Sequence, residues 1–132
     1  MTRFVIDPDV ALRLAVERTA IGGEHQLVAP TLLRSQLLAT LFRSVRRGEL
    51  TEAEASAHVD YVRGLRIRLL GDRVLQRVAW RIAEQLGWED TYTAEYVAVT
   101  TLQADALVTL DEDLARSVSG LVTVAPYESL TG

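Results

Sequence analysis

The chain has no cysteine and no lysine among its 132 residues. Without cysteine it forms neither a disulfide framework nor a thiolate zinc site, so any metal must be held by oxygen atoms, with help at most from a histidine. Neither His25 nor His58 has a metal-ligand neighbour at short spacing, so both are interpreted as incidental. Without lysine it has no Schiff-base lysine, no P-loop lysine and no lysine of a response-regulator phosphorylation site. These absences exclude several covalent and nucleotide-binding mechanisms before any motif is considered.

Long hydrophobic runs are also missing. No run approaches the roughly 18 apolar residues of a membrane-spanning helix. Asp7 and Pro8 stand where a signal peptide requires an apolar stretch. We therefore expect a cytoplasmic protein without a membrane partner. A length of 132 residues, with 48% of them apolar, predicts one compact domain over residues 1–132.

Charge is unevenly distributed along the chain. All 14 basic residues are arginines, against 18 acidic residues, which gives a net charge of −4. Nine of the acids but only one arginine, Arg116, lie in the stretch from Glu84 to Glu128. An acidic stretch of this kind either forms a solvated surface or holds a cation.

Hydrophobic periodicity and turn residues predict strands that alternate with helices. Strands are expected over residues 4–6, 66–70, 106–110 and 121–124. Helices are expected from Pro8 to Arg18, from Pro30 to about Gly48, from Thr51 to Arg63, from Asp72 to Leu86, from an N-cap at Asp90 to Gln103, and over 112–118. The segment 20–25, with its glycine pair, is expected to be a loop. This alternation is typical of an α/β fold with a central parallel sheet of about four strands flanked by helices.

Two acids directly follow apolar strand segments, Asp7 after residues 4–6 and Asp111 after residues 106–110. Ligands of a parallel sheet bind outside the carboxyl ends of the strands, so both side chains are expected at that edge. Asp90 begins the preceding helix, and Asp113 lies two residues beyond Asp111. Converging carboxylates repel one another unless a divalent cation neutralises them. All four acids are therefore candidate ligands of Mg²⁺ or Mn²⁺, with helix capping as the alternative role.

Four short segments give the chain a familiar order: Phe4–Asp7, Val28–Leu33, Tyr96–Ala98 and Leu107–Asp111. Together with the helix-rich middle of the chain, they resemble the PIN domain of VapC-type toxins along nearly the whole sequence. The resemblance implies a three-layer PIN-like fold. It also implies a Mg²⁺- or Mn²⁺-dependent endoribonuclease that hydrolyses RNA phosphodiester bonds with metal-activated water, and a cognate antitoxin as partner in a toxin-antitoxin pair.

Two positions depart from the four acids of that family. Gln36 stands in place of a glutamate and Thr93 in place of an aspartate, so only Asp7 and Asp111 match. Gln36 keeps an oxygen ligand without its charge, and Thr93 offers a hydroxyl or a site for water. Asp90, one helical turn before Thr93, is the candidate replacement for the missing carboxylate. The catalytic residues predicted on this basis are Asp7, Asp90 and Asp111.

Two other interpretations remain open at this point. A PIN fold that has lost its nuclease activity can survive as a binding module for an antitoxin or for RNA, and the two altered acids favour that alternative. The run Asp7-Pro8-Asp9 also fits the Asp-x-Asp motif of haloacid dehalogenase phosphatases. Those enzymes require a later basic residue, usually lysine, and are normally longer, which argues against this class.

Arginines recur every four residues along the helix expected after Asp72, at Arg73, Arg77 and Arg81. The helical wheel places Trp80 beside this row and away from the apolar face. An outward tryptophan among arginines is typical of a protein interface or a base-stacking surface, and a solvated arginine face is the alternative. We expect Trp80 to be covered by a second chain, either a symmetry mate in a homodimer or an antitoxin. A second basic group lies at Arg43, Arg46 and Arg47.

Overall fold

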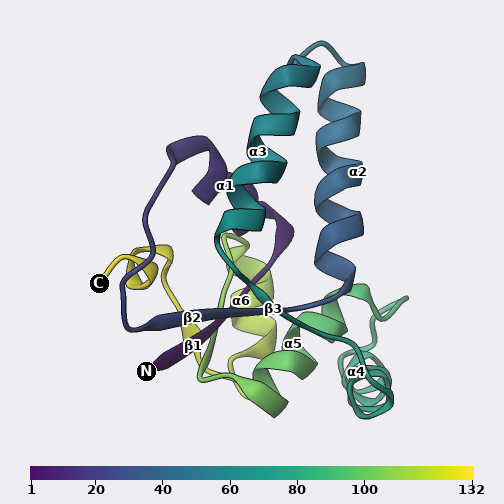
Figure 1. Cartoon of the computed structure of the whole chain (residues 1–132). Helices are drawn as coiled ribbons and strands as arrows, with labels where there is room; N and C mark the ends of the chain where they lie inside the picture. The colour runs from purple at the N-terminus through teal and green to yellow at the C-terminus, as the bar shows by residue number, and fades with distance from the viewer.

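The computed structural model describes all of residues 1–132 and contains a five-stranded parallel sheet (Figure 1). Its strands are β1 (Thr2–Ile6), β2 (His25–Pro30), β3 (Arg68–Leu70), β4 (Ala106–Val108) and β5 (Val124–Ala125). They are arranged in the order β3-β2-β1-β4-β5, and every neighbouring pair is parallel. The helices are α1 (Pro8–Glu17), α2 (Leu32–Arg46), α3 (Glu52–Gly64), α4 (Arg73–Leu86), α5 (Tyr92–Gln103), α6 (Glu112–Val118) and the short 3₁₀ helix η1 (Tyr127–Leu130).

Helices cover the sheet on both sides and make it the middle of three layers (Figure 1). The helices α1, α2 and α3 pack against one another, and α2 and α3 form a long hairpin that projects beyond the sheet. On the other side, α5 packs against β1, β2 and β4, and α4 packs against α5. The predicted α/β architecture is therefore confirmed, although the sheet has five strands in place of the expected four. No helix is both long enough and apolar enough to span a membrane.

The strand missing from the sequence prediction is β2, whose first residue was assigned to a loop. Its buried segment runs only from Leu27 to Pro30, the last residue of the strand. A run this short shows no periodicity, and a proline beside it reads as the start of the next helix. Pairing with β1 and β3 on both sides, which is a tertiary property, makes it a strand.

The last strand was predicted too early in the chain. Residues 121–124 were expected to form it, but only Val124 and Ala125 pair with β4. The amides of Leu121 and Val122 donate to the carbonyl of Val118, at 2.8 and 3.0 Å, and so close the turn after α6. The apolar side chains in this stretch pack against the core from a turn and not from a strand.

Helix ends follow local signals closely. Thr51 and Glu54 form the predicted capping box at the start of α3, and the Asp72 carboxylate accepts from the Leu75 amide at 2.8 Å to start α4. Gly87 ends α4 with a φ of 69°, which glycine adopts without strain. The predicted N-cap at Asp90 is wrong by one position, because α5 begins at Tyr92 and its N-cap residue is Thr91. Asp90 instead accepts from the Tyr92 amide at 3.2 Å from the preceding turn.

The most buried helix is α5, because it lies between the sheet and α4. Six of the seven residues from Ala94 to Thr100 are buried. A helix that is apolar on all sides belongs in an interior. Its one buried polar side chain, Thr100, donates to the Tyr96 carbonyl at 2.8 Å and is satisfied within the helix. The helix as a whole packs against β1, β2 and β4, and its first two turns carry Thr93, which is exposed, and Tyr96, which is buried.

Candidate functional site

The sheet grows in two directions from β1. The strands β2 and β3 lie on one side of it, whereas β4 and β5 lie on the other. In an open parallel sheet, connections that diverge in this way leave a crevice outside the carboxyl ends of the two strands involved. Those strands are β1 and β4, and the residues that follow them lead to Asp7 and Asp111.

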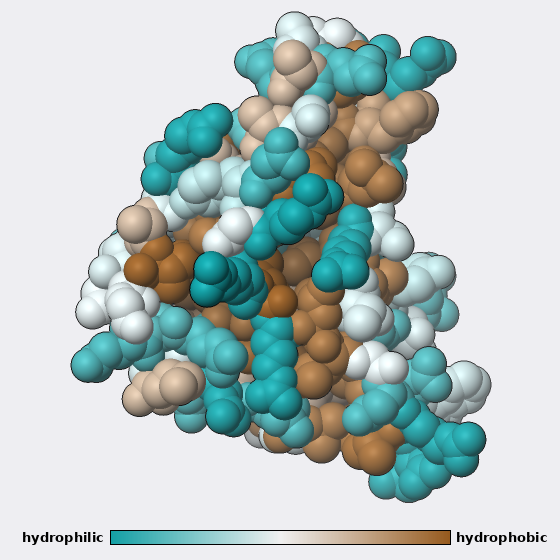
Figure 2. All heavy atoms as spheres, in the orientation of Figure 1, coloured by the Kyte–Doolittle hydropathy of each residue, from teal (hydrophilic) through white to brown (hydrophobic).

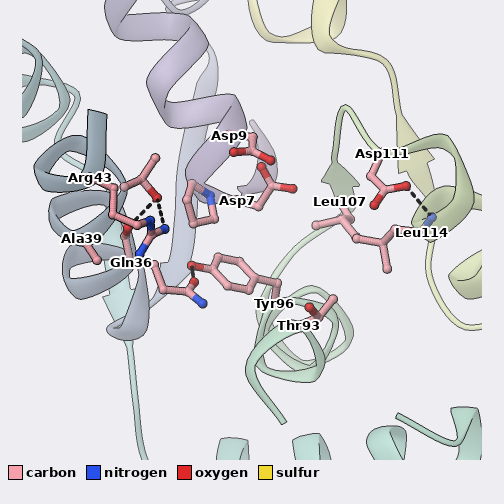
Figure 3. A pocket seen from close by; sticks show the side chains of 12 residues that line it. Asp7, Asp9, Gln36, Ala39, Arg43, Thr93, Tyr96, Leu107, Asp111 and Leu114 are labelled. Carbon is pink, nitrogen blue, oxygen red and sulfur yellow. Dashed lines mark hydrogen bonds between the residues drawn. The ribbon is translucent and has the colours of Figure 1, made fainter. Parts of the chain in front are cut away.

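A cavity of about 400 Å³ lies at this crevice (Figure 3). Asp7 and Asp111 both line it, so the structure brings together the two acids that follow the inner strands. The positions that depart from the four-acid pattern, Gln36 on α2 and Thr93 on α5, line the same cavity. Its other polar lining residues are Asp9, Thr40, Arg43 and Tyr96.

Asp7 is the half-buried acid of the cavity and the N-cap of α1. Its Oδ1 accepts from the Val10 amide at 2.9 Å. Burial raises the pKa of its carboxyl above the ordinary value of 3.8 and outweighs the hydrogen bonds from Val10 and Thr109, while the charge of Asp9 raises it further. No arginine forms an ion pair with Asp7. A bound cation would relieve this uncompensated charge.

Asp111 is exposed and caps α6. Its Oδ1 accepts from the amides of Asp113 and Leu114, at 2.9 and 3.1 Å. The capping role considered for each acid is therefore present in both Asp7 and Asp111. Each cap uses Oδ1, and a carboxylate has further acceptor positions, so capping and cation binding are compatible.

The α2 side of the cavity carries hydrogen-bond donors. Gln36, Thr40 and Arg43 follow one another at helical spacing on one face of α2. Thr40 Oγ1 donates to the Gln36 carbonyl at 2.9 Å and accepts from Arg43 Nη2 at 3.4 Å. Figure 3 shows Tyr96 Oη directed at the side chain of Gln36, where it donates to Oε1 at 2.7 Å. The cavity thus has an acidic wall, formed by Asp7, Asp9 and Asp111, and a donor wall on α2.

Tyr96 is buried beneath the donor wall. Burial raises the pKa of its hydroxyl far above the ordinary value, and the charges of Asp7 and Glu95 raise it further. The phenol therefore keeps its proton at neutral pH and is a donor to Gln36. Tyr96 belongs to a segment that resembles the PIN family, but that resemblance does not predict its contact with Gln36.

The two remaining candidate acids lie beside the cavity and not in it. Asp90 and Asp113 line a neighbouring hollow, which shares Thr93 and Asp111 with the cavity. Asp113 forms an ion pair with Arg116. The histidines are elsewhere: His25 begins β2 and His58 lies on α3. No group of three or more acidic or histidine side chains is gathered closely enough to hold a metal ion.

The oxygen atoms of the cavity nevertheless suit a hard cation that is held by only two carboxylates. Carboxylate oxygens are the protein ligands that Mg²⁺ and Mn²⁺ prefer, and Mg²⁺ commonly binds through one or two carboxylates and several waters. Asp7 and Asp111 supply two such groups from neighbouring strands. The uncompensated burial of Asp7 is the observation that most favours a cation here.

Three cavity residues, Asp9, Thr40 and Arg43, were not proposed as site residues from the sequence. Arg43 was noted only as part of a basic group with Arg46 and Arg47, and of these the structure brings only Arg43 to the cavity. A signal for it was present, because Arg43 lies seven residues, or two helical turns, after Gln36. The signal becomes visible only once Gln36 is known to face a site.

Comparison with known proteins gives a structural likeness alone. No protein-family model matches the sequence, and no curated protein does. The structure is similar to the crystal structure of PAE2754 from Pyrobaculum aerophilum, with a TM-score of 0.74 and 23% sequence identity. The match covers 98% of this chain and 92% of that one. It supports the three-layer α/β fold along the length of the chain.

Proposed function

We propose that the cavity between β1 and β4 hydrolyses phosphodiester bonds of RNA with Mg²⁺ or Mn²⁺, as in PIN-domain endoribonucleases of the VapC type. The observation that carries the proposal is the position of Asp7 and Asp111. They follow adjacent parallel strands at the point where the chain connections diverge to opposite sides of the sheet, and they line one cavity. Three of the four segments that resemble the PIN family contribute lining residues, namely Asp7, Tyr96, Leu107 and Asp111.

The residues of the acidic wall have defined tasks in this proposal. Asp7 and Asp111 hold the cation, which when bound polarises a phosphate oxygen and lowers the pKa of a water molecule. Asp90 lines the neighbouring hollow together with Thr93, and in this proposal it would supply part of the missing charge, either directly or through a water held by Thr93. The proposal includes a cognate antitoxin that restrains the activity.

The first test is cleavage of a panel of structured RNAs by the purified, antitoxin-free chain with Mg²⁺ or Mn²⁺. We expect Asp7→Asn and Asp111→Asn each to abolish cleavage, because each removes one of the two carboxylates that this proposal assigns to the cation. Asp60→Asn on the exposed surface of α3 is the matched control and should cleave like the wild type. Cleavage that persists in EDTA, or in both cavity variants, would contradict the proposal.

The role of Asp90 is tested separately. Asp90→Ala should abolish cleavage while lowering the free energy of unfolding by only about 1 kcal/mol, the value of one lost hydrogen bond. Activity and urea unfolding of the same preparation decide between a catalytic and a structural role. If cleavage is unchanged in this variant, Asp90 only stabilises the turn before α5 and the active site operates without it.

A binding module without catalysis is the second candidate function. Two observations favour it: no group of three metal-ligating side chains is formed, and Tyr96 occupies the amide oxygen of Gln36. The double variant Gln36→Glu/Thr93→Asp has the four acids of the family and should increase cleavage. If the wild type is silent and this variant cleaves RNA, the chain is a binding module that has kept the fold of a nuclease.

A further inference from the structure

We propose that the donor wall of α2 is a phosphate-binding subsite whose donors are Gln36 and Arg43, and that Gln36 contacts the anionic substrate and not the cation. Thr40 lies between them, and its hydroxyl proton is used in the hydrogen bond to the Gln36 carbonyl. The assignment of that phosphate to an RNA strand rests on the proposed function. The subsite itself, which would take a phosphate group of any origin, rests on the geometry of α2.

The hydrogen bond from Tyr96 fixes which end of the Gln36 amide is free. Tyr96 Oη donates to Oε1 at 2.7 Å, so the carbonyl end of the amide faces a buried donor, which uses one of its two acceptor positions. The amide nitrogen has no hydrogen-bond partner within the chain. An NH₂ group is a donor only, and it binds a phosphate oxygen but not a metal ion. The residue that looks like a weakened metal ligand in the sequence therefore offers the opposite chemistry.

Arg43 supplies the charge of the subsite. Arg43 lines the cavity, and its Nη2 donates one long hydrogen bond of 3.4 Å to Thr40 Oγ1. None of the ion pairs in the structure includes Arg43. A guanidinium has five donors in a planar fork that matches a phosphate group, and only one of them is used here. Arg43 is therefore available for an anionic ligand.

The two walls together select a ligand that carries both signs of charge. An isolated anion on the donor wall faces the carboxylates of Asp7, Asp9 and Asp111, which oppose its binding. A cation on the acidic wall removes this repulsion. Phosphate binding and cation binding should accordingly favour each other, as expected for two sites that share one cavity.

The experiment measures anion binding and cation binding separately, without catalysis. A short fluorescein-labelled single-stranded RNA and inorganic phosphate are titrated in EDTA, and Mn²⁺ is titrated in the absence of both. Arg43→Ala should weaken RNA and phosphate binding about tenfold, the loss of one charge-assisted hydrogen bond, and leave Mn²⁺ affinity unchanged or slightly higher. Arg46→Ala removes the same charge from α2 outside the cavity and is the matched control.

Gln36→Met decides between the two roles of Gln36. It should weaken anion binding and leave Mn²⁺ binding unchanged, whereas Gln36→Glu should weaken anion binding and tighten Mn²⁺ binding. Loss of Mn²⁺ affinity in Gln36→Met with anion binding intact would overturn the proposal, as would equal anion binding by Arg43→Ala and the wild type. Because these titrations need no cleavage, a silent nuclease assay contradicts the proposed function and leaves the subsite standing.

Discussion

Asp7 combines three structural roles. It ends the central strand, it caps α1 through Oδ1, and its carboxyl lines the cavity in a half-buried position. The hydrogen bonds from Val10 and Thr109 favour the charged form, whereas burial and the charge of Asp9 disfavour it. Burial is the largest of these effects, because the pKa is raised overall. In the absence of a cation, this residue is a source of local instability at neutral pH.

The pH dependence of unfolding should reveal that instability. The folded state binds the Asp7 proton more tightly than the unfolded chain does, so stability falls as pH rises from about 3.8 through the raised pKa. Asp7→Asn keeps the cap and removes the charge. In EDTA at neutral pH we expect the free energy of unfolding of Asp7→Asn to exceed that of the wild type by on the order of 1 kcal/mol, which is a rise of a few degrees in Tm.

Thermal unfolding of EDTA-treated wild type and Asp7→Asn across about pH 4 to 8 measures this effect. The difference in Tm between the two proteins should become smaller towards about pH 4, where more of Asp7 is protonated. Added Mn²⁺ should raise the Tm of the wild type and leave that of the variant unchanged. A variant that melts below the wild type at every pH would mean that the Asp7 charge stabilises the fold.

Individual site residues were predictable where chemistry and strand position coincide. Asp7 and Asp111 were predicted because an acid that directly follows an apolar strand of a parallel sheet lies at the carboxyl edge of that sheet. Arg43 was not, because nothing in one helix says which of its faces lines a cavity. The orientation of Gln36 was also out of reach, since it depends on a hydroxyl that lies 60 residues away in the chain.

Among the elements, α1 and η1 show how the end of the chain is attached. Tyr127 Oη donates to Glu17 at 3.0 Å, and Arg13 pairs with Glu17 at 3.1 Å. The Arg13 guanidinium also lies over the Tyr127 ring, 3.9 Å from its centre. Hydrogen bonds from Arg13 and Tyr127 lower the pKa of Glu17. The group links the first helix to the last.

This link should contribute stability that is lost in acid. Because the pKa of Glu17 is lowered in the folded state, its contribution is present above the ordinary value of 4.5 and disappears as pH falls through the lowered pKa. Tyr127→Phe removes one of the hydrogen bonds. The urea midpoint of this variant should therefore decrease less than that of the wild type as the pH is lowered. Tyr92→Phe, at an exposed tyrosine, is the control. Identical acid limbs in all three proteins would contradict this role for the link.

Helices were easier to predict than strands, for a physical reason. The ends of α3 and α4 are fixed by neighbours in sequence, such as Thr51 with Glu54, and such signals are readable. The strands β2 and β5 owe their existence to partners across the sheet, at Val5 and Leu107. Local sequence carries little of that information, so one strand was missed and another misplaced.

At the scale of the molecule, two apolar features remain uncovered. Trp80 on α4 is 65% exposed, which confirms the predicted register of that helix, and Arg73, Arg77 and Arg81 line the same shallow hollow. A second feature is the groove of about 540 Å³ between α2, α3 and β3. Figure 2 shows hydrophobic side chains at the surface below the α2–α3 hairpin, framed by polar ones. Surfaces of this kind are typical of protein interfaces.

The prediction that a second chain covers Trp80 is tested by self-association. Trp80→Ala should raise the dissociation constant of a homodimer at least tenfold, because central tryptophans dominate interface energies. Sedimentation velocity over a range of concentrations measures it, with Leu102→Ala at another exposed apolar position as the control. A wild type that stays monomeric at every concentration would exclude the homodimer and leave the antitoxin as the candidate partner.

The central place of β1 has a consequence for how the protein is made. β1 emerges from the ribosome long before its partner β4, with Phe4 pairing to Ala106 across about a hundred residues. The cavity therefore cannot form on a nascent chain until the segment that ends in Asp111 has been translated. A chain interrupted before β4 carries Asp7 on an unfinished sheet, with one strand edge open. If the cavity does cleave RNA, a cell is exposed to it only after translation has passed Asp111, and truncated products are harmless as nucleases but prone to aggregate.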